Sequence, residues 1–232
     1  MNRTKSIIGL GLLVATCAVA IAAVDAITLK YAPKVGDDLK YKMTGQVQIM
    51  GTQADISADF EYKVTKVDTD GSYTIESSQK NMQVSAMGQT MNPPDSKDTT
   101  VSKANGEIID YQTENQDPSA WRMAELNSFV YPDKPVNVGD SWQSKVVADP
   151  KKGTVAATCD YKVDSLEKVG NHDTAKIKVS YKETEGSDPA SSDGFVWLDT
   201  KDGAVVKSEA NWANVPSQQG PISAKITVSR AE

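Results

Sequence analysis

Residues 39–64 read Leu-Lys-Tyr-Lys-Met-Thr-Gly-Gln-Val-Gln-Ile-Met-Gly-Thr-Gln-Ala-Asp-Ile-Ser-Ala-Asp-Phe-Glu-Tyr-Lys-Val and carry the clearest structural signal in the chain. Apolar and polar residues alternate on both sides of Met50-Gly51-Thr52. Alternation with a period of two is typical of a β-strand with one buried face, and a glycine suits the tight turn between antiparallel strands. The stretch therefore predicts a long β-hairpin.

The same alternation continues along the chain, and Asn105-Gly106 and Asp202-Gly203 are typical hairpin turns. A switch of phase between Ile75 and Met82 predicts a bulge or a bend. One short helix is expected over 118–128, with Asp117 as its N-cap and Pro118 as its first residue. Further strands are predicted near residues 73–86, 101–109, 155–163, 175–181, 195–198, 204–212 and 222–228.

Three blocks of sequence occur twice, in the same order and roughly 100 residues apart. The paired blocks are Ala32-Pro33-Lys34-Val35-Gly36-Asp37 with Pro135-Val136-Asn137-Val138-Gly139-Asp140, Asp59–Val64 with Thr158–Val163, and Lys103–Ile109 with Thr200–Val206. We interpret this as an internal duplication, with repeats at 27–116 and 132–232 joined by a helical linker at 117–131. The fold class is all-β, mainly antiparallel, with one short helix. The two pseudo-symmetric repeats form one large curved sheet or half-barrel, the alternative being two tandem β-sandwiches.

The N-terminus has the features of a signal peptide, assigned to residues 1–26. Arg3 and Lys5 precede an uncharged run from Ile7 to Val24, and small residues close that run. Cleavage is expected after Ala26, which places the protein in the periplasm, at the cell surface or outside the cell. An uncleaved anchor and a lipoprotein modified at Cys17 are the alternatives, and neither would make the mature domain membrane-spanning.

Composition limits the possible functions. The 232 residues carry a formal net charge of −6, whereas nucleic-acid binding needs a basic surface. The single histidine, His172, lies in a turn-like sequence and is expected to be exposed, and Cys159 is expected to be buried. No nucleophile elbow, P-loop, zinc or Cys-x-x-Cys motif occurs. The sequence therefore predicts no catalytic residue, metal or cofactor, and the acidic segment from Glu183 to Gly194 is expected to be a solvated connector.

The methionines give the one suggestion of a binding site, because most of them lie in the first repeat. Flexible thioether side chains pack in cores and also line pockets for irregular apolar ligands. Core packing is the simpler interpretation, and copper binding a remote one. The candidate ligand-binding residues are Met43, Phe60, Tyr62, Met82 and Met87.

The repeated blocks resemble those of uncharacterised secreted bacterial β-proteins with tandem Pro-x-x-Val-Gly-Asp units, and this resemblance implies a style of fold only. A curved sheet around a helix would also be similar, more remotely, to the half-barrels of lipoprotein-localisation factors, which hold acyl chains in a concave apolar face.

Two functions remain after these exclusions, an enzyme being the least favoured. The first is an exported, non-enzymatic protein that binds a lipid or other apolar small molecule on a concave β surface. The second is a structural or protein-interaction module of the cell envelope. A cavity lined by the candidate residues favours the first, and an exposed aromatic patch around Trp142, Trp197 or Trp212 favours the second.

Overall fold

The computed structural model describes residues 26–49, 51–114, 119–217 and 220–231. The predicted signal peptide lies outside these ranges except for Ala26, and so does the predicted helix start at Asp117-Pro118. The described part of the chain contains no helix long and apolar enough to cross a membrane.

The chain forms twelve strands and the helix α1 (Ala120–Asn127). The first half contributes β1 (Asp38–Ile49), β2 (Thr52–Val67), β3 (Tyr73–Ala86), β4 (Gln89–Met91), β5 (Ser96–Ser102) and β6 (Ile108–Thr113). The second half contributes β7 (Ser141–Val146), β8 (Ala157–Val169), β9 (His172–Glu183), β10 (Ser191–Asp199), β11 (Val205–Val215) and β12 (Ile222–Arg230).

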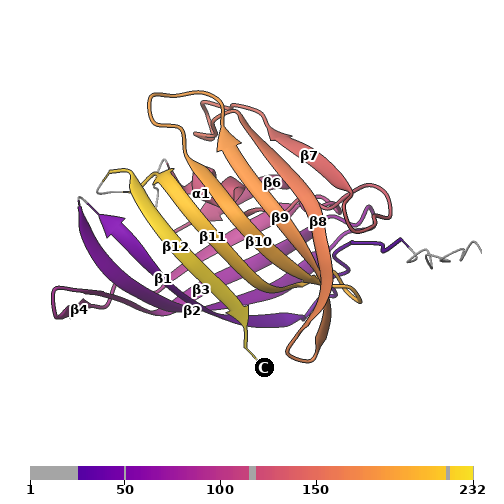
Figure 1. The fold of residues 1–232 in the computed structure, drawn as a ribbon, viewed down its shortest axis with the longest axis horizontal. Coiled ribbons are helices and arrows are strands. Elements are labelled where there is room, and N and C mark those ends of the chain that lie inside the picture. Colours follow the sequence, from indigo (N-terminus) through magenta and orange to yellow (C-terminus); the bar gives the residue numbers. More distant parts are fainter. Residues whose placement is uncertain (1–25, 50, 115–118, 218–219, 232) are drawn as a thin grey trace, which may run out of the picture.

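All twelve strands belong to one curved, open antiparallel sheet (Figure 1). Its order is β6-β5-β3-β2-β1-β12-β11-β10-β9-β8-β7, with β4 paired to β3 alone. Each half is a simple meander, and the pairing of β1 with β12 joins the halves, while β6 and β7 are the edges. The predicted all-β class with one short helix is confirmed, in its single-sheet form.

The alternating pattern produces the predicted hairpins. Residues of β1 pair directly with residues of β2, from Asp38 with Lys63 to Ile49 with Thr52. The predicted bulge in β3 is confirmed, since the register of β2 and β3 shifts between Ser57 and Asp59, where Asn81 has a φ of 53°.

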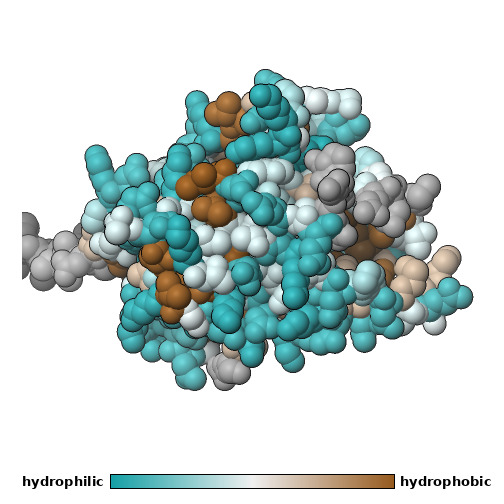
Figure 2. All heavy atoms as spheres, turned by 180° about the vertical axis from the view of Figure 1, so that it is seen from behind, coloured by the Kyte–Doolittle hydropathy of each residue, from teal (hydrophilic) through white to brown (hydrophobic). Residues whose placement is uncertain are grey.

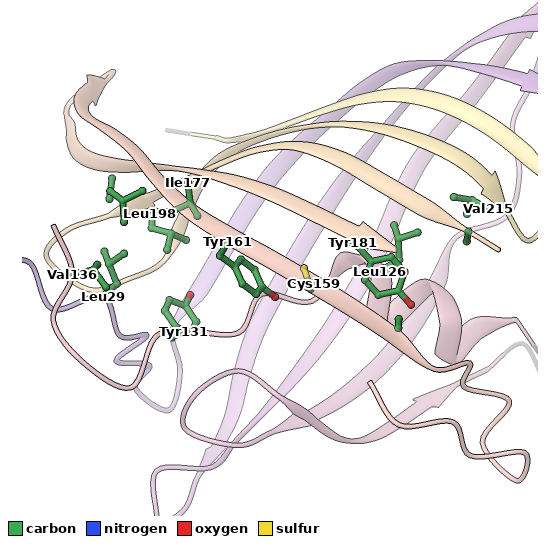
Figure 3. Close-up of a cluster of buried hydrophobic side chains, with 14 residues drawn as sticks. Leu29, Leu126, Tyr131, Val136, Cys159, Tyr161, Ile177, Tyr181, Leu198 and Val215 are labelled. Carbon is green, nitrogen blue, oxygen red and sulfur yellow. The ribbon is translucent and has the colours of Figure 1, made fainter. Parts of the chain in front are cut away.

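Two hydrophobic clusters lie on the same face of the sheet, and Trp212 packs against both. The larger cluster is covered by residues outside the sheet (Figure 3). Leu29 comes from the segment 27–32, here called the N-terminal strap, and Val136 comes from the segment 128–136, the central strap. Leu126 of α1 completes the cover. These segments close the second half of the concave face.

Each strap lies against a hairpin turn of the opposite half. The amide of Ala32 donates a 3.0 Å hydrogen bond to the carbonyl of Asp202, and the amide of Tyr131 donates a 2.8 Å bond to the carbonyl of Asn105. Ile27 and Val136 then pair with each other through two backbone bonds of 2.8 and 2.9 Å. The straps therefore tie the two halves together.

The two Val-Gly-Asp blocks have the same local geometry. The amide of Gly36 donates to the carbonyl of Val64 at 2.9 Å, and the amide of Gly139 donates to the carbonyl of Val163 at 2.8 Å. The amides of Val64 and Val163 in turn donate hydrogen bonds of 2.9 Å to the carbonyls of Asp37 and Asp140. This agreement supports the internal duplication, which stays a prediction.

Two titratable side chains differ from expectation. Glu183 was expected in a solvated connector, and this was wrong, because its side chain is 1% exposed and pairs with Arg122 of α1. The guanidinium donates two hydrogen bonds, of 2.7 and 2.6 Å, to the two carboxylate oxygens. His172 is also not a free turn residue, because its Nδ1 lies 2.6 Å from a carboxylate oxygen of Asp199.

Candidate functional site

The candidate site is the concave surface of β1, β2, β3 and β12, where the smaller hydrophobic cluster lies. Alternation places small and medium apolar side chains there, and directly paired residues share this face. We call this surface the apolar face. Its buried members are Met43, Val47, Ala54, Ala58, Ala224 and Ile226, and its partly buried members are Ile49, Ile56, Phe60, Met82, Val84, Ala86, Trp212, Ile222 and Val228.

The apolar face differs from the larger cluster in what covers it. All of the residues assigned to it within the described ranges come from strands of the one sheet, whereas the larger cluster also contains strap and helix residues. Small residues such as Ala54 and Ala58 are shielded by the curvature and by their larger neighbours, while Phe60 and Met82 stay partly exposed. Figure 2 shows hydrophobic surface set back among hydrophilic residues.

A group of aromatic rings continues the apolar face along β2. The rings of Phe60 and Tyr62 stack with centroids 6.1 Å apart, and Tyr41 lies 5.3 Å from Tyr62. The Tyr41 hydroxyl donates a 2.8 Å hydrogen bond to the carbonyl of Val205, which fixes its ring. Burial raises the pKa of Tyr62 to about 12, with the charge of Asp98 adding to the effect.

The structure brings four of the five predicted residues together. Met43, Phe60 and Met82 belong to the apolar face, and Tyr62 stacks on Phe60 at its end. Met87 does not join them, because it lies in the turn between β3 and β4 with a φ of 51° and is 90% exposed. The prediction grouped Met87 with the strand methionines because it follows them closely in the sequence. The alternation of β3 ends before Met87, so its side chain does not share their face.

Beyond Tyr62 the concave face becomes polar. Strand register aligns Tyr62 of β2 with Ser77 of β3, Asp98 of β5 and Thr113 of β6. Burial raises the pKa of Asp98, while hydrogen bonds from the hydroxyls of Ser77 and Tyr111 act in the opposite direction. Sequence analysis missed Asp98, because the segment 96–102 is polar apart from Val101, and one apolar residue gives no alternation to mark which residues face inward.

Two shallow depressions on the convex face are lined mostly by residues of polar type. The larger has a volume of about 490 Å³ and includes Gln143, whose side-chain amide donates a 2.7 Å hydrogen bond to Asp160. The smaller, about 300 Å³, includes Thr44, Asp55 and Ser57. Polar residues that alternate with the core are expected on the solvated side of a sheet, so neither depression needs a ligand to explain it.

Among the described residues, no three histidine, cysteine, aspartate or glutamate side chains are placed to hold a metal ion. Cys159 is buried, as predicted, and burial raises its thiol pKa to about 11, which leaves little reactive thiolate at neutral pH.

The three tryptophans named for an interaction surface are each covered by other side chains, Trp197 by Lys176 and Lys207 and the other two by core residues. Trp142 stacks on Tyr161 with centroids 5.1 Å apart, and its indole N–H donates a 2.8 Å hydrogen bond to the carbonyl of Val130. Trp197 is 5% exposed and donates a 2.6 Å hydrogen bond to Glu167. Trp212 packs against both hydrophobic clusters. They do not form the exposed aromatic patch that would favour an interaction module.

No family model matches the chain, and no curated protein matches it. Among solved structures, it is similar to a Bacteroides fragilis protein with a YmcC-like fold, with a TM-score of 0.38 and 12% identity over 90% of this chain and 100% of that one. DynF, from the dynemicin biosynthesis pathway of Micromonospora chersina, has a TM-score of 0.25 and 8% identity over 95% and 92%. These scores are too low to support an inference about function.

Proposed function

We propose that this chain is an exported, non-enzymatic protein that binds an apolar or lipidic small molecule on the concave face of its sheet. The observation that carries the proposal is the apolar face, whose partly exposed members include Phe60, Met82 and Ile56. Burying apolar surface is worth about 25 cal/mol per Å², so a ligand that covers these side chains gains free energy in proportion to the covered area.

The contrast between the two halves also supports a ligand. The straps and α1 cover the larger cluster, whereas the apolar face receives no helix or strap residue from the described ranges. Soluble proteins rarely leave a contiguous apolar surface unused, and such surfaces mark binding sites. Export is proposed from the signal-peptide features of residues 1–26. The alternative role as an interaction module has less support, because Trp142 and Trp212 pack against the hydrophobic clusters and Trp197 is 5% exposed beneath two lysines.

The proposal is tested by titrating the purified protein, without residues 1–26, with the neutral apolar fluorophore N-phenyl-1-naphthylamine. We expect a saturable rise in fluorescence. Replacing Met82 by glutamate places a carboxylate against the bound probe, so Met82→Glu is expected to weaken binding by about tenfold or more.

Met87→Glu is the matched control, because it makes the same chemical change at a methionine that is 90% exposed. It is expected to leave the affinity unchanged. Circular dichroism checks that both variants fold, and Val84→Asn on the same face replaces Met82→Glu if that variant does not. Unsaturable fluorescence in the wild type, or equal losses in the apolar-face variant and Met87→Glu, would contradict the proposal.

A further inference from the structure

The carboxylate of Asp98 lies on the concave face where the apolar surface ends. Asp98 pairs directly with Ser77, and Ser77 pairs with Tyr62, so all three side chains project from the same side of the sheet. Tyr62 is in turn stacked on Phe60 of the apolar face. Neighbouring strands are about 4.8 Å apart, which places Asp98 roughly 10 Å across the sheet from Tyr62.

The groups around Asp98 are neutral hydrogen-bonding side chains. Ser77 of β3 and Tyr111 of β6 provide hydroxyls that hydrogen-bond to the carboxylate, and Tyr62 of β2 contributes a phenol. No lysine, arginine or histidine in the described part of the chain forms an ion pair with Asp98 or affects its pKa. A partly buried carboxylate that has hydrogen bonds but no cation beside it is stabilised further when a positive charge binds next to it.

Asp98 is nevertheless reachable. Asp98, Tyr62, Ser77 and Tyr111 are each partly exposed rather than buried. From Tyr62 to Ala54, β2 extends roughly 26 Å at about 3.3 Å per residue, which is enough to lie beneath a long alkyl chain. The concave face thus has a long apolar surface that ends at the carboxylate of Asp98.

We infer that the ligand is a cationic amphiphile, a long-chain amine whose ammonium group binds Asp98 while its alkyl chain covers Phe60, Met82 and the rest of the apolar face. This inference rests on the proposed function and adds the chemistry of the head group. The ammonium donates hydrogen bonds to the carboxylate and to the oxygens of nearby hydroxyls, while those hydroxyls donate to the carboxylate. A fatty acid of the same length would place its own carboxylate beside Asp98, and the two like charges would repel.

The test is competition against bound N-phenyl-1-naphthylamine by decylamine, decanol and decanoic acid at pH 7.5. The three competitors have alkyl chains of equal length, so apolar contact contributes equally to their binding. The head group alone therefore sets the order of their affinities. We expect decylamine to displace the probe at a concentration about tenfold lower than decanoic acid, with decanol between them. In Asp98→Asn, the amine and the acid are expected to compete within about threefold of each other.

Asp110→Asn is the matched control, because Asp110 lies on neighbouring β6 but pairs with Val101 and so projects from the opposite face to Tyr111. It is expected to keep the wild-type preference, which separates a local effect of Asp98 from a general effect of net charge. Equal competition by amine and acid in the wild type, or a preference that survives in Asp98→Asn, would overturn the inference while leaving the proposed function standing. Failure of the probe itself to bind would instead overturn the proposed function.

Discussion

Glu125 shows at the residue scale how a partly buried carboxyl makes the fold sensitive to pH. Burial raises the pKa of this α1 carboxyl to about 7, with the charge of Glu107 adding to the shift and Lys152 opposing it. The ordinary value is 4.5, so the folded protein binds more protons than the unfolded chain between about pH 4.5 and pH 7. The contribution of Glu125 to stability is therefore lost as the pH rises through this window.

Glu125→Gln keeps the shape of the side chain and removes its ionisation. We expect the variant to be more stable than the wild type by about 1–3 kcal/mol at pH 8 and nearly equal to it at pH 5. Urea unfolding followed by tryptophan fluorescence at both pH values measures the difference. Glu185→Gln, at an exposed position, should show neither effect. The same stability difference at pH 5 and pH 8 would refute the assignment of this pH dependence to Glu125.

At the scale of elements, the straps depend on two glycines in hairpin turns. Gly106 has a φ of 90° and a Cβ there would collide with the carbonyl oxygen of Phe129 in the central strap. Gly203 has a φ of 75° and a Cβ there would collide with the carbonyl oxygen of Lys30 in the N-terminal strap. Each strap therefore passes so close to a hairpin turn that only glycine fits at that position of the turn.

Gly106→Ala and Gly203→Ala are each expected to lower the free energy of unfolding by about 3 kcal/mol or more, because the strap must move and the backbone is strained. Gly88→Ala is the control, since its φ is 78° but no atom lies within 4 Å of the added Cβ. Gly88→Ala should lower the free energy of unfolding by about 1 kcal/mol, because only the backbone strain of a positive φ contributes. Chemical denaturation of the three variants compares them, and equal losses would mean that the straps contribute nothing at these turns.

At the scale of the whole molecule, alternation was sufficient to predict long antiparallel hairpins such as β1–β2, because a period of two is a local signal. The pairing of β1 with β12 could not be predicted, since those strands are at opposite ends of the chain and no local pattern links them. The straps were missed for the same reason, as Leu29 and Tyr131 gain their partners only through long-range packing.

The candidate site was predicted in part for a related reason. Met43, Phe60 and Met82 follow the strand alternation, so their shared face could be read from the sequence. Met87 was misplaced because the strand ends before it. Asp98 was missed because Val101 is the one apolar residue of its strand, which is too few to mark the inner side.

Native mass spectrometry after incubation with a total bacterial lipid extract tests most directly whether the apolar face binds a ligand. We predict that the wild type and Met87→Glu carry an adduct that dissociates on collisional activation and has the mass of a single lipid. Met82→Glu is expected to lose most of that adduct, because a carboxylate in the apolar face opposes burial of an alkyl chain. A wild type that keeps only its polypeptide mass, or an adduct of equal abundance in all three proteins, would contradict the account.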